Sequence, residues 1–253
     1  MQGDATTASK LPHALFPLIR KLESVTRLSD KERRAIEALP VRVRTLSARQ
    51  DIVRDGDLAT QCCLVLEGWA CRYKFLSEGR RQIFSFHIAG DIPDLQSLHI
   101  PLMDHNFGTL TPAIVALIPH ESMHALTARY PTIAAALWRD TLIDAAIFRE
   151  WLLAMGRRPA FEHLAHLFCE LYLKQAAVGL AGDHRCPLPI TQTDLADATG
   201  MTSVHINRVL KEMRGRGLIT LHRHTLVVKA WDELIRVCEF DATYLHLQKR
   251  AAG

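Results

Sequence analysis

Two histidines four residues apart give this chain one pattern that could bind a metal ion. His120, Glu121 and His124 match His-Glu-x-x-His, in which two imidazoles on adjacent helical turns bind Zn²⁺ and the carboxylate acts as a base. Here the pattern directly follows Ile118-Pro119 and therefore begins a helix that leaves a strand, where Glu121 is a favourable charge at the helix N-terminus. We expect this simpler role. A metal-dependent hydrolase is the alternative, and it would require stoichiometric zinc that is lost in His120→Ala.

The remaining histidines and the cysteines form no obvious metal or redox site. His163 and His166 precede Cys169 on one predicted helix, where a polar helix surface explains them without a ligand. The six cysteines have neither Cys-x-x-Cys spacing nor the density of a disulfide framework, which indicates a reducing compartment. Cys186 is the best candidate for a redox-active thiol, because its predicted linker should be exposed. No Ser/His/Asp or phosphate-loop arrangement occurs, so we expect no enzyme activity, no bound metal and no cofactor.

Composition excludes several classes of protein. Of the 253 residues, 48% are hydrophobic and 23% are charged, which is ordinary for a globular chain and unlike a disordered or fibrous one. No apolar stretch approaches the roughly 18 uncharged residues of a membrane-spanning helix. The first ten residues lack the basic and apolar segments of a secretory signal. We expect a soluble, cytoplasmic protein without a membrane partner.

Positive charge is concentrated in one segment. The formal net charge is +4, yet residues Met201–Lys229 hold six basic side chains and a single acidic one, Glu212, while the rest of the chain is close to neutral. A cationic segment on a near-neutral protein is typical of polyanion binding. Charge alone does not distinguish this role from an ordinary solvated surface.

The N-terminal half combines a capped helix with short strands. Residues 1–20 show no persistent pattern, and we interpret them as an arm with a short helix. Ser29 is placed to cap a helix over residues 31–39. From about residue 41 to 118 apolar side chains recur with a period of two, and Gly/Asp turn signals separate the runs. This pattern predicts an antiparallel sandwich or roll.

A long helix follows the strands. It is predicted from Pro131 to Met155, and its apolar residues occupy more than one face of the helix. Such a helix must bury two faces, and we expect one to pack on the roll and the other on a partner subunit. Pro159 is well placed to begin the next helix, which extends to about Gln175. Residues 179–189, rich in Gly and Pro, are interpreted as a linker.

Residues 191–217 carry the most informative pattern, which predicts two helices joined by a tight turn. Thr191 can cap the first helix, and Gly200 suits a turn that requires a positive φ angle. Thr202 can cap the second helix, whose buried side is predicted to be Ile206, Val209, Leu210 and Met213. Its opposite side begins with Ser203, Val204, His205, Asn207 and Arg208, the part of a recognition helix that enters a major groove.

Two short apolar runs after this pair of helices predict a β-hairpin. Residues 218–220 and 226–228 flank His222, Arg223, His224 and Thr225. This hairpin is interpreted as a wing beside the DNA backbone, with Arg223 as a phosphate contact. Two packed helices with no role in DNA binding are the alternative, but the combination of helices, turn, wing and charge favours a DNA-binding module.

Four segments of the chain resemble the Crp/Fnr family of bacterial transcription regulators, over nearly the whole length. They are Gly79–Ile83 leading to Gly90-Asp91, Ala116–Pro119, Arg157–Leu171 and Leu188–Ile219. The resemblance implies an α+β fold with an N-terminal antiparallel β-roll of the cyclic-nucleotide-binding jelly-roll type, a long dimerisation helix and a C-terminal winged helix-turn-helix. It also implies a homodimer bound to a palindromic operator in double-stranded DNA, with RNA polymerase as a further partner of an activator.

The expected domains are an arm over residues 1–20, a sensor roll over 21–128, a dimerisation helix over 129–156, and a DNA-binding domain with a C-terminal tail over 157–253. Carried over by position, the family's base-contacting face falls on Ser203, Val204, Asn207 and Arg208, with Arg208 as the arginine that commonly binds guanine. Val204 replaces an acidic residue of many members, which leaves open whether the half-site follows the best-known consensus. The complete predicted DNA-contacting set is Thr191, Gln192, Thr193, Ser203, Val204, His205, Asn207, Arg208, Lys211 and Arg223.

The effector cannot be assigned from the resemblance. Members that bind cyclic nucleotides hold ribose and phosphate with a Gly-Glu pair and an Arg-Ser/Thr pair, but residues 90–116 contain no Glu and no Arg. The N-terminal cysteine cluster of iron–sulfur members is absent, because the first cysteine is Cys62. Haem-binding members have a histidine where this chain has Asp94-Leu95-Gln96. A ligand-binding module without sequence-specific DNA binding is therefore kept as a second alternative.

Overall fold

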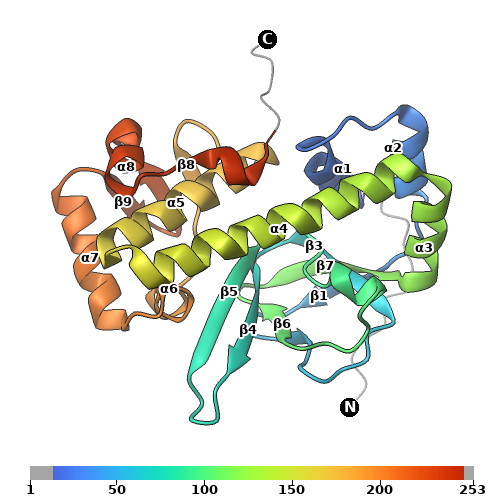
Figure 1. The fold of residues 1–253 in the computed structure, drawn as a ribbon, viewed down its shortest axis with the longest axis horizontal. Coiled ribbons are helices and arrows are strands. Elements are labelled where there is room, and N and C mark those ends of the chain that lie inside the picture. The colour runs from blue at the N-terminus through green and yellow to red at the C-terminus, as the bar shows by residue number, and fades with distance from the viewer. Residues whose placement is uncertain (1–13, 248–253) are drawn as a thin grey trace. The chain divides into compact units, whose positions relative to one another are not determined.

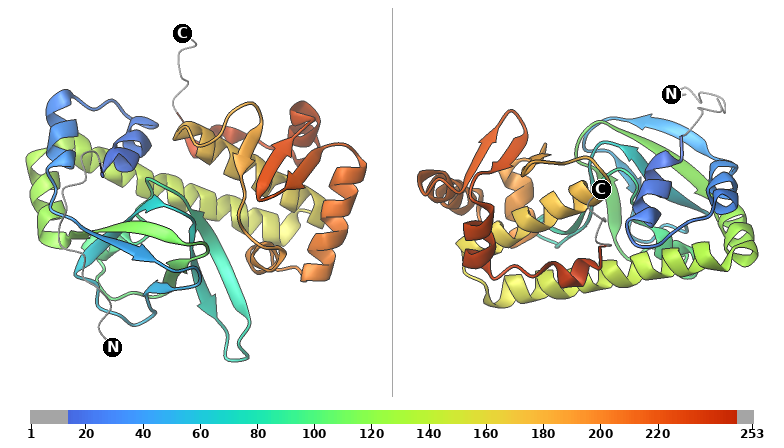
Figure 2. Two further views of the ribbon diagram at one scale, coloured as in Figure 1. Left: turned by 180° about the vertical axis from the view of Figure 1, so that it is seen from behind. Right: turned by 90° about the horizontal axis from the view of Figure 1, so that it is seen from above.

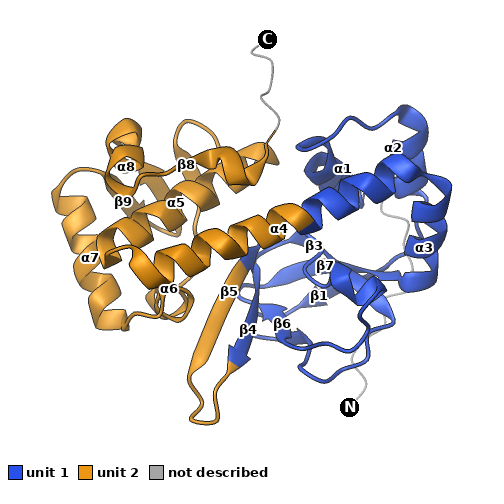
Figure 3. Ribbon diagram, in the orientation of Figure 1, with its two compact units in different colours: residues 1–74, 86–141 blue, residues 75–85, 142–253 orange. Residues whose placement is uncertain are grey.

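A computed structural model describes residues 14–247, which form two compact units (Figure 3). The first unit contains residues up to 74 together with 86–141, and the second contains residues 75–85 together with the chain from 142 onward. The division falls within the long helix and assigns the tip of one β-hairpin to the second unit. Most of the predicted N-terminal arm, residues 1–13, lies outside the described residues.

Two short helices precede the strands of the first unit. They are α1 (Phe16–Glu23) and α2 (Asp30–Glu37) (Figure 1). Ser29 caps α2 as predicted, because its hydroxyl accepts from the Glu32 N–H while the Glu32 carboxylate accepts from the Ser29 N–H. Ile36 and the apolar side of α1 are buried in the core of the unit.

The predicted roll is present as two antiparallel sheets. One has the strand order β1-β7-β3 and the other β2-β6-β4-β5. The bounds are β1 (Arg42–Leu46), β2 (Asp51–Val53), β3 (Gln61–Glu67), β4 (Ala70–Phe75), β5 (Arg81–His87), β6 (Asn106–Thr109) and β7 (Ala113–Pro119), with the 3₁₀ helix η1 (Leu95–Leu98) between β5 and β6. Alternation within β3 places Cys62 and Cys63 in two separate apolar clusters, since successive side chains point to opposite faces of a strand.

Helices dominate the rest of the chain. They are α3 (His120–Arg129), α4 (Pro131–Arg157), α5 (Ala160–Ala177), α6 (Gln192–Thr199), α7 (Ser203–Gly215), α8 (Trp231–Cys238) and the 3₁₀ helix η2 (Ala242–Leu245). This part of the chain also contains a small antiparallel sheet of order β8-β10-β9. Its strands are β8 (Arg185–Pro187), β9 (Ile219–His222) and β10 (Thr225–Val228). The predicted linker over residues 179–189 therefore contains a strand, because β8 pairs with β10. No helix within residues 14–247 is long and apolar enough to cross a membrane.

Helix α5 is buried on nearly all sides, which corrects the predicted polar surface. His163, His166 and Cys169 are all buried, because the C-terminal residues cover this face of the helix. The His166 ring lies 4.8 Å from the Phe240 ring and is stacked at 5.9 Å on Tyr244, measured between centroids. The exposure expected for Cys186 is also wrong. Cys186 is 1% exposed, because it lies on β8 and pairs with Leu226 of β10, and all six cysteines are buried and form no disulfide.

Burial and, to a smaller extent, the nearby Arg158 guanidinium lower the pKa of His163 to about 4 and that of His166 to about 3. In the unfolded chain these rings take up protons below about pH 6.5, whereas in the folded chain they stay neutral to about pH 4. The unfolded state therefore binds more protons in this range, so stability falls as the pH is lowered through it. We expect each histidine to reduce the free energy of unfolding by about 1–2 kcal/mol between pH 7 and pH 5.

Urea unfolding at the two pH values measures this difference. In His166→Gln the pH dependence should be smaller than in the wild type, whereas His222→Gln, at an exposed histidine of the wing, should leave it unchanged. Equal pH dependence in the wild type and His166→Gln would contradict the prediction.

Candidate nucleic-acid interface

Helices α6 and α7 form the predicted pair, and local capping defines both N-termini. Thr191 and Asp194 form a reciprocal capping box at the start of α6. Gly200 ends α6 with a φ angle of +70°, a conformation that favours glycine, as the sequence predicts. The Thr202 hydroxyl then accepts from the His205 N–H and caps α7.

Helix α7 separates a buried face from an exposed one. The buried face consists of the four predicted residues, Ile206, Val209, Leu210 and Met213. Ser203, Val204, Arg208 and Lys211 are exposed, and Val204 keeps 82% of its side-chain surface, while His205 and Asn207 are half-buried.

Two of the predicted DNA-contacting residues, from different helices, are hydrogen-bonded to each other. The Asn207 Nδ2 atom donates to the Gln192 Oε1 atom at 3.2 Å, which links α7 to the first residue of α6. Thr191, Gln192 and Thr193 are exposed at the start of α6, where the Asp194 carboxylate accepts from the Thr191 N–H at 2.9 Å. Within the described part of the chain, Arg208, Lys211 and Arg223 pair with no carboxylate.

The predicted wing is a two-residue hairpin between β9 and β10, seen from two further directions in Figure 2. His222 pairs with Thr225, and the two residues between them, Arg223 and His224, both have positive φ angles, of 47° and 59°. This is the geometry of a type I′ turn, which usually contains Asn or Gly. The turn holds the exposed Arg223 at the tip of the hairpin.

The His-Glu-x-x-His pattern has the structural role that the sequence favours. Helix α3 begins at His120 and carries Glu121 in its first turn. The His120 Nε2 atom lies 2.9 Å from the Ser97 hydroxyl, and the His124 ring contacts the His99 ring at 5.8 Å. No group of three or more His, Cys, Asp or Glu residues that could hold a metal ion occurs among residues 14–247.

Comparison with known proteins agrees with this arrangement. Residues 162–237 match the model of the Crp-like helix-turn-helix domain, and residues 43–130 match that of the cyclic nucleotide-binding domain. The chain belongs to the Crp/Fnr family. This Crp/Fnr protein is a DNA-binding transcriptional regulator, and the predicted family and fold class are confirmed.

Several Crp/Fnr relatives are similar over most of the chain. The nitrogen fixation regulation protein FixK of Rhizobium meliloti is 28% identical over 184 residues, which cover 72% of this chain and 80% of FixK. The transcriptional activator protein FnrL of Cereibacter sphaeroides is 25% identical over 192 residues, covering 73% of this chain and 75% of FnrL. The structure of FixK2 from Bradyrhizobium japonicum has the same fold, with a TM-score of 0.71, 24% identity, and coverage of 79% of this chain and 98% of FixK2.

The roll of this Crp/Fnr regulator contains an ion-pair cluster that the sequence analysis missed. Lys21 on α1 donates to Asp91 at 2.7 Å and lies 3.4 Å from Asp140 on α4. Burial lowers the pKa of Lys21, but Asp140 and Asp91 together raise it above its usual value. Gly90 permits this packing, because a Cβ atom there would lie 2.6 Å from the Pro17 carbonyl oxygen. Asp91 and Lys21 are 70 residues apart, so no local signal could reveal the pair.

Asp94 is a second buried carboxyl group in the same unit. Its Oδ1 atom accepts from the Cys63 N–H at 2.8 Å, while its Oδ2 atom is buried without a hydrogen-bond partner. Burial raises the pKa of Asp94 to about 7. The buried Arg72 lies beside this segment and donates to the Pro93 carbonyl oxygen at 2.6 Å. Arg72 is on β4, outside the 90–116 segment in which the sequence contains no arginine.

Proposed function

We propose that this regulator is a cytoplasmic homodimer that binds a palindromic operator and receives a signal other than a cyclic nucleotide through its roll. The observation that carries the proposal is the exposed face of α7, whose polar and basic side chains are free of ion pairs beside a wing with Arg223 at its tip. This face fits a major groove, and the wing fits the adjacent backbone. We assign the protein no catalytic activity.

Base recognition is assigned to the first two turns of α7. Arg208 would contact guanine O6 and N7 with its two-pronged guanidinium group, and Asn207 or His205 would contact base edges or phosphate. Ser203 and Val204 complete the base-contacting face. Thr191, Gln192, Thr193, Lys211 and Arg223 would contact phosphates and hold the helix in register.

The homodimer is supported by an exposed stripe along α4. Trp138, Leu142, Ala145, Arg149 and Leu152 follow one another at alternating spacings of four and three residues, the repeat of a coiled-coil seam. Trp138 is 64% exposed and Leu152 is 69% exposed. The large apolar members of the stripe, Trp138, Leu142 and Leu152, are all exposed, and such a face fits a second copy of the same helix.

The proposal about the signal rests on the charge of the roll. Residues 90–116 carry no basic side chain except histidine, Asp91 and Asp94 are buried carboxyl groups, and a buried phosphate would need cationic partners. Lys21, the cation at Asp91, is already held by two carboxylates. An activating role, which the name of FnrL suggests for this chain, would make RNA polymerase a further partner.

The first test is the selection of bound duplexes from a random DNA pool by the wild-type protein and by Arg208→Ala. The wild type should enrich a palindrome. Arg208→Ala should lose about 1–3 kcal/mol of binding free energy for that operator and accept other bases at one position of each half-site. Unchanged preference in Arg208→Ala would show that another residue recognises the base. No enrichment by any protein sample, with or without cell-extract ligands, would contradict the proposed function.

Arg223→Ala should behave differently, because a phosphate contact carries no sequence information. Its affinity should fall for all duplexes alike, and the slope of log K against log salt concentration should decrease by about one for each half-site. Titration of the selected operator and of a scrambled duplex at several salt concentrations measures both quantities. A loss confined to the operator would assign Arg223 to base recognition instead.

A further inference from the structure

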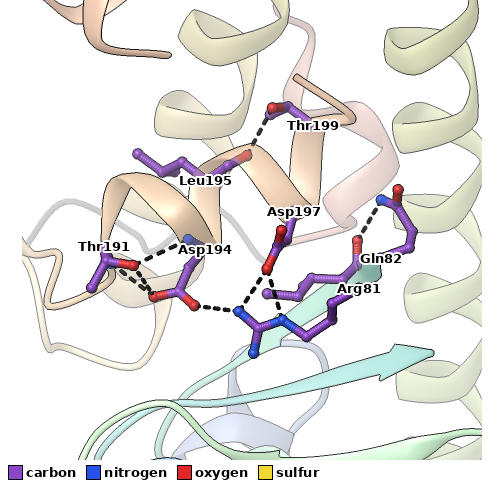
Figure 4. A network of polar contacts seen from close by, with 8 residues as sticks. Arg81, Gln82, Thr191, Asp194, Leu195, Asp197 and Thr199 are labelled. Carbon is purple, nitrogen blue, oxygen red and sulfur yellow. Dashed lines mark hydrogen bonds and ion pairs between the residues drawn. The ribbon is translucent and has the colours of Figure 1, made fainter. Parts of the chain in front are cut away.

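The hairpin between β4 and β5 contacts the first helix of the helix-turn-helix. Its tip belongs to the second compact unit, together with α6 and α7 (Figure 3). Arg81, the first residue of β5, extends its guanidinium between two carboxylates of α6 (Figure 4). Its Nη2 atom lies 2.8 Å from Asp194 Oδ1, and its Nε atom donates to Asp197 Oδ2 at 2.7 Å. The next residue, Gln82, donates to the Ala198 carbonyl oxygen at 3.4 Å.

Asp194 connects Arg81 to the turn that is assigned to phosphate binding. Its side chain is buried, and while Oδ1 contacts Arg81, Oδ2 accepts from both the N–H and the hydroxyl of Thr191, at 2.9 and 2.7 Å (Figure 4). One carboxylate therefore joins the hairpin to the N-cap of α6. The following residue of this turn, Gln192, in turn contacts Asn207 of α7. An arginine held by two carboxylates in this way restricts the orientation of the helix more than a single contact does.

Arg81 also changes the charge that α6 presents to DNA. The helix carries two charged residues, Asp194 and Asp197, and both are acidic. Without a cation they would oppose the approach of a phosphate backbone to residues 191–193. The guanidinium offsets this charge from a position where its own side chain is largely buried, at 17% exposure.

We propose that Arg81 is a positioning residue for DNA binding. It orients the first turn of α6 through Asp194 and compensates the acidic charge of this helix through Asp197. The inference rests on the proposed function, because it concerns how residues 191–193 meet the operator. Arg81 itself contacts no base or phosphate.

The test compares Arg81→Ala, Arg81→Lys and Arg80→Ala for binding to the operator that the wild type selects. Arg81→Ala should weaken binding roughly tenfold, and Arg81→Lys should recover part of the loss, because it keeps the charge without the planar fork. Arg80→Ala is the matched control on the same hairpin, since Arg80 is exposed and pairs with the equally exposed Glu78 at 2.9 Å. It should bind like the wild type. Thermal unfolding of each variant identifies any that fails to fold.

The double variant Arg81→Ala/Asp197→Asn separates positioning and charge compensation from a general loss of structure. Removing the carboxylate left without a cation should restore operator binding by about threefold relative to Arg81→Ala. Damage to the fold alone would not be repaired by a second substitution in α6. Wild-type affinity in Arg81→Ala would overturn the inference. It would also be overturned if a folded Arg81→Lys bound the operator as well as Arg80→Ala does and the double variant showed no recovery. Failure of the wild type to select any operator would instead contradict the proposed function.

Discussion

Glutamate in place of Trp138 and Leu152 is expected to convert the proposed dimer into monomers and to weaken operator binding by more than about a hundredfold. Both side chains lie in the exposed stripe of α4, which the α4 helix of a second copy would cover in the proposed dimer. A dimer engages two half-sites with one association step, and a monomer loses the second half-site. The charge at each position would also be brought close to the same charge on the partner helix, which is unfavourable.

Analytical ultracentrifugation combined with operator titration tests this expectation. Leu58→Glu is the control, because Leu58 is a 73% exposed leucine of the roll and lies outside α4. It should leave both the molecular mass and the affinity unchanged. A wild-type protein that sediments as a monomer at micromolar concentration, or a Trp138→Glu/Leu152→Glu variant that remains a dimer, would refute the assignment of the seam.

Replacing Lys21 with Met should lower the free energy of unfolding by about 3–5 kcal/mol, the usual cost of removing one partner from a buried ion pair. The ammonium group lies between Asp91 and Asp140, and the side chain of Asp91 is only 6% exposed. Met keeps the volume of the lysine stem but removes the cation that Asp91 and Asp140 share. Because Asp91 also accepts from the Ile88 N–H at the Gly90 turn, we expect the loss to include this turn.

Urea unfolding of three variants separates the ion pair from the packing of the stem. Lys74→Met removes a surface pair with Asp55 in which both side chains are about half exposed, and it should change stability by less than about 1 kcal/mol. Adding Asp91→Asn and Asp140→Asn to Lys21→Met should recover part of the loss, because the negative charges that Lys21 neutralises are then removed as well. A loss in Lys21→Met no larger than in Lys74→Met would show that water screens the cluster.

Local structure in the DNA-binding module was predictable because its determinants are close in sequence. Thr191 and Asp194, Gly200, and Thr202 with His205 are caps and turns whose partners lie within three residues. The buried face of α7 follows from the period of 3.6 residues per turn. In the roll, the period of two similarly explains why Cys62 and Cys63 point to opposite faces of β3.

The burial of histidines and cysteines was much harder to predict. The sequence places His163, His166 and Cys169 on one helix, but only the tertiary structure decides that C-terminal residues cover that helix. Cys186 was expected in an exposed linker, and its burial depends on the pairing of β8 with β10. The period of apolar side chains and the composition of a segment describe that helix or loop alone. Its burial depends on which other segments pack against it.

Patterns along the chain were sufficient to predict the class of this protein: the roll, the long helix and the helix-turn-helix with its wing, together with the residues that we propose to contact DNA. The ion pairs inside the two units, in contrast, became clear only from the packing of segments that are distant in sequence. Lys21 pairs with Asp91 across 70 residues, and Arg81 with Asp194 across 113. The physical reason is that a cap or an amphipathic face is encoded by neighbours along the chain, while an ion pair between distant segments is selected by the packing that brings those segments together.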